Sequence, residues 1–383
     1  MKNNKIAFII CTNDKDYMTE CMFYISQLKV PDDMELEIIR IEDAVSMTSG
    51  YNRAMRQSDA KYKVYLHQDV FILNENFIYD IIKCFEMDAE LGMLGIAGSR
   101  KVPNDARVWD SLDIGGCYSV GTFGGIGYAA VKPEINNPSG FYEETEFIDG
   151  MLIATSKDIE WDERIDGFHY YDLTQCIRFR EAGYKVAVVR QEDLWCFHDF
   201  GPLNLETYDK YRKIFCYLYP GYDYLEESDN INVFRLCEQI VKVLAPMIQS
   251  RRYEEIKTIL QDVDNAIYFN QKLLDYYFLM ELHDLGVYME ERDMLLLRHA
   301  LIRTWAGKDT IDHIINNIDT GEWPVQAVIA MSIHSIPMRG CELLEVIRNS
   351  LFDKGVMDKD KWDESMRTVE QYETDHLPLA TFE

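Results

Sequence analysis

The first seventy residues alternate between short apolar runs and amphipathic stretches, and this alternation restricts the fold more than any other feature. Apolar runs at residues 5–11, 36–41 and 61–66 have the length and composition of strands buried on both faces. Between them, residues 17–28 and 49–57 carry apolar side chains at helical spacing, and Thr48 or Ser49 is the predicted N-cap of the second helix. Strands that alternate with helices build a mainly parallel, doubly wound sheet, so the sequence predicts a Rossmann-like α/β unit.

The strand pattern continues after a helix predicted at residues 75–87. Residues 91–97, 147–155 and 184–189 predict further buried strands, and residues 172–182 predict a helix that ends before Gly183. A glycine directly after the last helical residue is the usual C-terminal signal of a helix.

Residues 98–140 differ in composition, because they are rich in Gly, Pro, Asn and Ser. This composition is typical of hairpins and of loops that contact substrate. Residues 125–130 match G-x-G-x-x-A by letter, but Pro133 follows too soon for the helix that a dinucleotide-binding motif requires. We therefore interpret this segment as a loop or hairpin.

From about residue 232 strand patterns nearly vanish and helical spacing dominates. The stretch at residues 226–232 is polar and marks the boundary, so we predict an α/β domain at 1–228 and an all-α domain at 229–383. A helical bundle explains the pattern better than a repeat array, because no repeated motif is evident. The predicted helices are 233–248, 253–260, 273–285, 292–305, 311–318, 325–333, 341–351 and 362–373.

Charge and cysteine usage narrow the function classes. The formal net charge of −27 disfavours general binding to nucleic acid, and an anionic substrate would need a local cation or metal. Nine scattered cysteines without a C-x-x-C pair predict reduced thiols in a cytoplasmic protein. No stretch has the length of a membrane span.

A polar triplet, His67-Gln68-Asp69, directly follows the third predicted strand. Ligands collect beyond the carboxyl ends of strands in open α/β sheets, and a carboxylate there can hold a divalent cation. Taken alone, the triplet is also compatible with a simple turn.

The order of these parts resembles a family 2-type glycosyltransferase with a GT-A fold. The parts are the parallel-sheet start, an Asn-bearing helix, a strand ending in x-x-Asp, a loop-rich middle, R-x-R-E-A-G-Y-K and a late His. HQDV and FHYYD more narrowly resemble the StrF-type glycosyltransferase-like group. The resemblance covers roughly residues 5–220 and leaves out the helical C-terminus.

The resemblance implies a nucleotide-sugar donor and a divalent metal, Mn²⁺ or Mg²⁺. Asp69 takes the place of the last Asp of D-x-D, whose first Asp is His67 here, and His198 matches the late His that completes the metal site. His67 can ligate manganese, bond the ribose or simply pack, and a lone His such as His198 is often structural. Implied donor contacts are Thr12, Asn13, Glu42, Asn52, His67 and Gln68.

Asp172 is the catalytic residue that the resemblance implies. Relatives open this helix with Glu-Asp, whereas Tyr171-Asp172 stands here, so the Glu is missing. Asp172 would accept the proton of the acceptor hydroxyl, although an Asp at a helix start is usually an N-cap. Asp149 and Trp109 are further candidates for acceptor or sugar contact. Trp109 and Trp161 offer apolar ring faces on which a sugar can stack, with a core role as the alternative for both tryptophans.

These observations predict an inverting, metal-dependent glycosyltransferase of the hexosyltransferase type, with a glycan or other hydroxyl acceptor. The altered D-x-D and the missing Glu also fit a non-catalytic protein that binds nucleotide-sugar or glycan. Asn52 has a plainer reading as a polar residue on a helix face. The helical domain could form a homo-oligomer, dock a partner or only support the sheet.

Overall fold

The computed structural model describes residues 1–108, 111–119, 136–200, 205–225, 230–262, 271–308, 310–335 and 340–376. The chain divides into two compact units. The first comprises Met1–Tyr118, Lys132–Asp199 and Leu205–Glu227, and the second comprises Ser119–Val131, Phe200–Asn204 and Ser228–Glu383. The predicted domain boundary after residue 228 stays a prediction.

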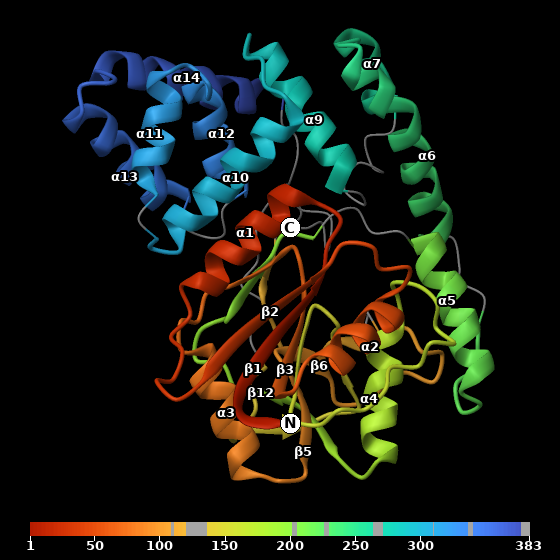
Figure 1. Ribbon diagram of the computed structural model, residues 1–383. Coiled ribbons are helices and arrows are strands. Elements are labelled where there is room, and N and C mark those ends of the chain that lie inside the picture. Colours follow the sequence, from red (N-terminus) through yellow and green to blue (C-terminus); the bar gives the residue numbers. More distant parts are fainter. Residues whose placement is uncertain are drawn as a thin grey trace. The chain divides into compact units, whose positions relative to one another are not determined.

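A seven-stranded sheet forms the centre of the first unit, in the order β2-β1-β3-β11-β5-β12-β9 (Figure 1). Strands β2, β1, β3, β5 and β12 run in one direction, and β11 and β9 run antiparallel to them. The mainly parallel α/β class predicted from the sequence is therefore confirmed. The strands span β1 Lys2–Cys11, β2 Glu35–Ile41, β3 Ala60–His67, β5 Leu91–Gly95, β9 Tyr142–Glu144, β11 Leu152–Thr155 and β12 Lys185–Val189.

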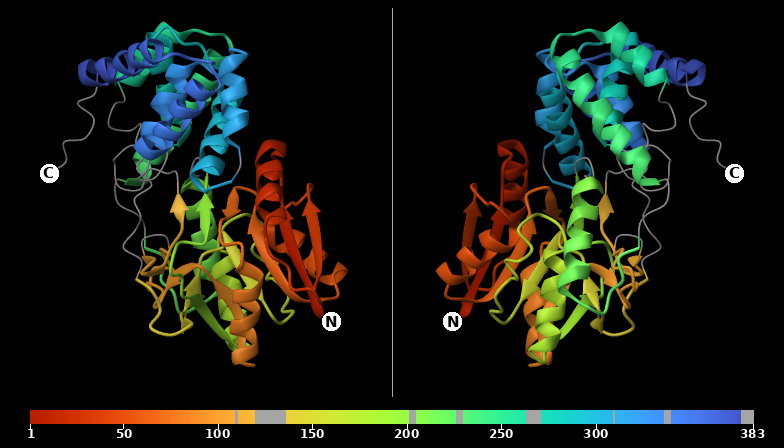
Figure 2. Two further views of the ribbon diagram at one scale, coloured as in Figure 1. Left: turned by 90° about the vertical axis from the view of Figure 1, so that its left-hand side faces the viewer. Right: turned by 90° about the vertical axis from the view of Figure 1, so that its right-hand side faces the viewer.

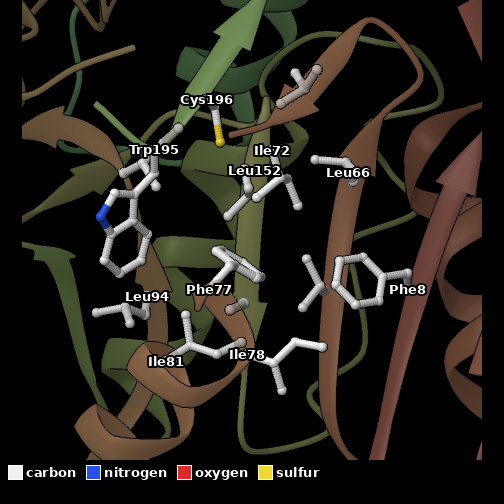
Figure 3. Packing of buried hydrophobic residues seen from close by; sticks show 14 of the residues in the cluster. Phe8, Leu66, Ile72, Phe77, Ile78, Ile81, Leu94, Leu152, Trp195 and Cys196 are labelled. Carbon is white, nitrogen blue, oxygen red and sulfur yellow. The ribbon is translucent and has the colours of Figure 1, made fainter. Parts of the chain in front are cut away.

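Helices cover both faces of this sheet, because successive strand residues point to opposite sides. Phe8 packs on one face with Phe77 and Ile81 of α3, whereas Ile9 belongs to the apolar cluster of the other face. Figure 3 shows the rings of Phe8 and Phe77 near each other within this cluster. The first face holds α1 (Lys15–Ser26) and α3 (Phe77–Met87), and the second holds α2 (Met47–Gln57), α4 (Tyr171–Glu181) and α5 (Leu205–Leu218).

Three local expectations were wrong. The N-cap of α2 is Ser46 rather than Thr48 or Ser49, since the Ser46 hydroxyl accepts a hydrogen bond from the Ser49 N–H. Two predicted strands are each divided, into β5 and β6 (Ala97–Ser99) and into β10 (Phe147–Ile148) and β11. Helix α5 was not predicted at all.

Small antiparallel pairings at the carboxyl end of the sheet extend it toward the site. Strand β4 (Val70–Ile72) pairs with β13 (Cys196–His198), and β6 pairs with both β10 and β7 (Ile114–Gly115). A short β8 (Tyr118–Ser119) completes the sheet of β4 and β13. These pairings bring segments far apart in sequence to the end of β3.

From Asn230 onward the described part of the second unit forms helices and their connections, in agreement with the helical domain predicted from residue 232. Helices α10 to α14, blue in Figure 2, pack against one another. Among the described helices, none combines the length and apolar composition needed to cross a membrane. The helices span α6 Asn230–Gln249, α7 Tyr253–Asp262, α9 Gln271–Asp284, α10 Glu291–Trp305, α11 Ile311–Asp319, α12 Val325–Ser335, α13 Gly340–Asp353 and α14 Lys359–His376.

Candidate active site

The backbone brings Asp69 and His198 together at the end of the sheet. Strand β3 ends at His67, a two-residue turn follows, and β4 begins at Val70. Because β13 runs antiparallel to β4, His198 lies opposite Val70. The Asp199 N–H donates to the carbonyl of Asp69 over 2.9 Å and fixes this register. Asp69 and His198, the two residues that the resemblance assigns to the metal, are thus neighbours.

His67, Asp69 and His198 form a cluster that can hold a metal ion. The possible ligand atoms of these three side chains all lie within 4.8 Å of one another. Among the described residues, this is the group of metal-ligating side chains that meets this criterion. Oδ1 of Asp69 lies 3.4 Å from Nε2 of His198 and 3.9 Å from Nδ1 of His67. That carboxylate oxygen is buried and has no hydrogen-bond partner. A buried, unsatisfied oxygen between two imidazoles fits a divalent cation.

The charge state of the cluster follows from burial and from Asp69. Burial lowers the pKa of His67, because an enclosed imidazolium loses solvation. Burial acts in the same direction on His198, but the Asp69 carboxylate outweighs it and raises the pKa of His198 to about 10. Burial opposes the charge on Asp69 as well, yet His198 holds the pKa of Asp69 below its ordinary value. A bound cation must displace the His198 proton, so metal affinity decreases as the pH is lowered.

A cavity of about 240 Å³ opens beside this cluster. It contains five of the predicted donor contacts as well as Asp69. Phe168, half-exposed at 51%, adds an aromatic ring to the wall that the sequence did not single out. Such a ring can stack on a base or on the apolar face of a sugar. The cavity is lined by Cys11, Thr12, Asn13, Glu42, Ala44, Met47, His67, Gln68, Asp69 and Phe168.

Gln68 holds the loop after β1 against the turn after β3. Its Oε1 accepts hydrogen bonds from the Thr12 hydroxyl over 2.7 Å and from the N–H groups of Asn13 and Asp14 over 3.0 Å each. Its Nε2 donates to Oδ1 of Asn13 over 2.7 Å. The side chain of Gln68 therefore forms part of the cavity wall and holds its shape. Both ends of its amide group already make hydrogen bonds within the protein.

Asp172 lies in the first turn of α4 and is not an N-cap. The N-cap position is Tyr170, whose left-handed backbone (φ 64°) is unusual for a residue other than glycine. The Tyr170 hydroxyl donates to the carbonyl of Ala106 over 2.8 Å, which helps to hold this conformation. The Asp172 carboxylate accepts hydrogen bonds from the N–H of Gly150 over 3.0 Å and from the N–H of Leu173 over 2.8 Å.

The surroundings of Asp172 suit it to accept a proton near neutral pH. Burial and the nearby charge of Asp149 raise the pKa of Asp172 to about 7, against the two backbone hydrogen bonds that favour the carboxylate. Asp149 itself caps the turn before β11, where its Oδ1 accepts from the Met151 N–H over 2.9 Å. The two acidic side chains therefore lie close enough for the charge of Asp149 to oppose ionisation of Asp172.

Tyr171, the residue before Asp172, contacts the candidate metal cluster. Its hydroxyl lies 2.5 Å from Nε2 of His67, 104 residues away in sequence. Gly150 leaves the necessary room, since a Cβ there would lie 2.2 Å from that hydroxyl and 3.0 Å from Oδ2 of Asp172. Neither Tyr171 nor Gly150 was predicted. Tyr171 lies within the FHYYD motif, but nothing in the sequence shows that its hydroxyl faces His67.

Asn52 lies apart from the cavity and fastens a loop. It is 1% exposed, its Nδ2 donates to the carbonyl of Trp161 over 3.0 Å, and its Oδ1 accepts from the Trp161 N–H over 2.7 Å. Trp161 is only 2% exposed, and its ring packs against other aromatic rings. It is therefore a core residue and not a sugar platform. Trp109 lies outside the described residues.

We expect Asn52→Ala to lower the free energy of unfolding by about 1–3 kcal/mol, because it leaves the buried Trp161 N–H unpaired. Urea denaturation measures the change. Arg53→Gln on the same helix is the matched control, because its ion pair with Asp43 is exposed and screened by solvent, so its loss should leave the free energy of unfolding nearly unchanged. If Asn52→Ala keeps its stability but binds nucleotide more weakly, the predicted contact between Asn52 and the donor gains support.

A comparison with protein families identifies the family of this chain. The family model described as "Glycosyltransferase like family" matches residues 7–219. No curated protein is similar enough to this chain to count as a relative.

Two solved structures illustrate how distant the structural likenesses are. S. aureus TarS 1-349 in complex with UDP is 14% identical with a TM-score of 0.36, over 75% of this chain and 93% of that chain. The mannosyltransferase PcManGT from Pyrobaculum calidifontis, in complex with GDP-Man and Mn²⁺, is 12% identical with a TM-score of 0.33, over 98% of this chain and 88% of that chain. These values are too low to carry an argument, and the assignment rests on the family model. Since that model spans residues 7–219 of 383, the protein belongs to this glycosyltransferase-like family.

Proposed function

We propose that this protein is an inverting, metal-dependent glycosyltransferase that moves a sugar from a nucleotide-diphosphate donor to an acceptor hydroxyl. The observation that carries the proposal is the link from Asp172 through Tyr171 to the cluster of His67, Asp69 and His198. A general base and a set of metal ligands at one site are the two parts that single-displacement transfer requires. When bound, a divalent cation neutralises charge on the departing diphosphate.

The chain's own residues account for the remaining requirements. Thr12, Asn13 and Glu42 line the cavity where the nucleoside lies in this proposal, and Phe168 offers a ring for stacking. Asp172 takes the proton of the acceptor hydroxyl while that oxygen bonds to the anomeric carbon. The bond from this carbon to the diphosphate oxygen breaks, and its electron pair leaves with the nucleotide. One displacement of this kind inverts the anomeric configuration.

Asp172 is oriented for this role by its two backbone hydrogen bonds. The N–H groups of Gly150 and Leu173 each bind a different carboxylate oxygen, so the group cannot rotate freely. Its raised pKa places the proton acceptor near the working pH, where general-base catalysis is most effective.

A donor screen tests the proposal. The full chain is incubated with Mn²⁺ and UDP, GDP or dTDP sugars in the presence of candidate glycan acceptors, and nucleotide release and product anomers are followed by NMR. Transfer with inversion of the anomeric centre supports the proposal. Retention, or no transfer from any donor, contradicts it.

The alternative is a non-catalytic protein that binds nucleotide-sugar or glycan. The observations that favour it are His67 in place of the first Asp of D-x-D and the missing Glu before Asp172. Calorimetry separates the two readings, because tight donor binding without transfer or hydrolysis identifies a binder. The helical unit is left with the predicted roles of homo-oligomer formation, partner docking or support of the sheet.

The proposed base predicts a pH dependence. Because the pKa of Asp172 is raised to about 7, its carboxylate is present above that pH and is lost below it. We expect kcat/KM to fall about tenfold per pH unit on the acid side of pH 7 and to level off above it. Metal occupancy must be checked at each pH, since protons compete with the cation for His198 and compete more strongly as the pH is lowered. A profile that stays flat down to pH 5.5 at full metal occupancy would exclude this role for Asp172.

A further inference from the structure

Among the described residues of the first unit, Ala106 and Tyr170 have a left-handed backbone although neither is glycine. The φ of Ala106 is 57° and that of Tyr170 is 64°. The two are buried and joined to each other, because the Tyr170 hydroxyl donates to the Ala106 carbonyl over 2.8 Å, across 64 residues of sequence. A left-handed backbone is unfavourable for a residue with a Cβ, so it persists only where surrounding contacts enforce it.

Helix α5 supplies such contacts on both sides of the first strained residue. Nη1 of Arg212, which is fully buried, donates to the carbonyl of Asp105 over 3.1 Å. The Tyr208 hydroxyl accepts from the Val108 N–H over 3.2 Å. The ring of Tyr208 also packs against the ring of Tyr170, with the ring centroids 5.0 Å apart. One helix therefore restrains both members of the strained pair.

Tyr170 is also the residue from which α4 starts, so its backbone sets the direction of the first helical turn. In that turn, the Tyr171 hydroxyl lies 2.5 Å from Nε2 of His67. Oδ2 of Asp172 accepts from the Gly150 N–H over 3.0 Å. Both contacts reach from α4 to other elements, and they therefore depend on the direction in which the helix begins. A return of Tyr170 to an ordinary backbone conformation would redirect this turn.

We propose that Tyr170 and Ala106 are positioning residues for the proposed base: their hydrogen bond, supported by α5, keeps Tyr170 left-handed and thereby orients the Asp172 carboxylate. The inference rests on the proposed function, because it concerns the base of the same reaction. Neither member of the pair lines the cavity beside the candidate metal cluster, so both act through Asp172 and not on the donor. The backbone strain is then part of the way in which the site is built.

Tyr170→Phe tests the proposal, because it removes the hydroxyl and keeps the ring that packs against α5. Loss of the bond loosens the contact of Asp172 with the Gly150 N–H, and a carboxylate that loses a donor is harder to ionise. We expect the titration of Asp172 to move up by at least about half a pH unit. We expect kcat to fall at least about tenfold, because the base is displaced, while the donor Kd changes less than about threefold.

Two measurements on the full chain give these quantities. NMR of ¹³C-labelled aspartate carboxyl groups follows the titration, and Asp172→Asn assigns the signal. Single-turnover kinetics use the donor and acceptor that the screen identifies. Tyr142→Phe is the matched control, since its hydroxyl in β9 donates to Oδ2 of Asp88 over 2.8 Å, outside the site. We expect it to keep the wild-type kcat and the wild-type titration of Asp172.

Ala106→Gly is the conservative variant of the partner residue. Glycine adopts a φ of 57° without strain and still offers the carbonyl to Tyr170, so kcat should stay within about twofold of the wild-type value. An unmoved Asp172 titration in Tyr170→Phe would overturn the proposal, as would a loss of kcat no larger than that of Tyr142→Phe.

The titration does not depend on turnover, so the two proposals can fail separately. If the wild-type chain transfers no sugar but the titration moves in Tyr170→Phe, the proposed function is refuted and the positioning of Asp172 is supported. If the wild-type chain transfers sugar and the titration does not move, the positioning role alone is refuted.

Discussion

Asp172→Asn is expected to lower kcat by about 10²–10⁴-fold, the usual contribution of a positioned general base. Asparagine keeps the shape of the side chain, but its single carbonyl oxygen keeps only one of the two hydrogen bonds from the N–H groups of Gly150 and Leu173. It cannot accept the proton of the acceptor hydroxyl. Because Asp172 is not among the metal ligands, Mn²⁺ and donor affinities should change by less than threefold. Single-turnover kinetics and calorimetry on the same preparations measure the two effects.

Asp149→Asn is the control for this experiment. Asp149 raises the pKa of Asp172 through its charge, so its neutralisation should move the acid limb of the rate profile to lower pH while transfer persists. In Asp172→Asn, by contrast, the acid limb should disappear along with the rate. If Asp172→Asn keeps full activity, the base is elsewhere. If Asp149→Asn instead raises KM for the acceptor, the predicted acceptor contact of Asp149 gains support.

The parts of the fold that were predicted correctly are those with a strong local signal. The apolar run from Val64 to Leu66 must be buried on both faces, and a run of that kind followed by polar residues places His67 and Asp69 at a strand end. The helices from α6 onward carry long amphipathic patterns. Helix α5 was missed because its many Tyr and Phe residues also suit strands, so composition alone does not separate the two.

The parts of the site that were missed depend on contacts between distant segments. The polar character of Asn52 is visible in the sequence, but its partner Trp161 lies 109 residues away, and the side chain fastens a loop instead of facing the cavity. The contact between Tyr171 and His67 likewise depends on the packing of α4 against the sheet. Gly150 was the one missed residue with a local signal, since a glycine inside a strand pattern often marks a break.

Gly150→Ala is expected to lower both Mn²⁺ affinity and kcat by about 100-fold, because it displaces both halves of the site at once. An added Cβ would lie 2.2 Å from the Tyr171 hydroxyl oxygen and 2.6 Å from its Cζ. The ring cannot tolerate these distances and must move away from His67. Displacement by about 1 Å of a group that positions reactants is enough for an effect of this size. EPR titration and single-turnover rates provide the measurements.

The cause of this effect is steric and not conformational. The φ of Gly150 lies outside the left-handed region, so alanine can adopt the backbone, and the obstacle is the Tyr171 ring together with Oδ2 of Asp172, 3.0 Å from the new methyl group. Overpacking of this kind costs about 1–3 kcal/mol of stability, which leaves a folded protein to assay.

Gly140→Ala is the matched control, since the nearest atom there lies 3.6 Å away. In Gly150→Ala/Tyr171→Phe the shortest contact is gone, so kcat should recover in part while Mn²⁺ affinity stays low. Wild-type kcat and affinity in Gly150→Ala would mean that Tyr171 does not connect the base to the metal ligands.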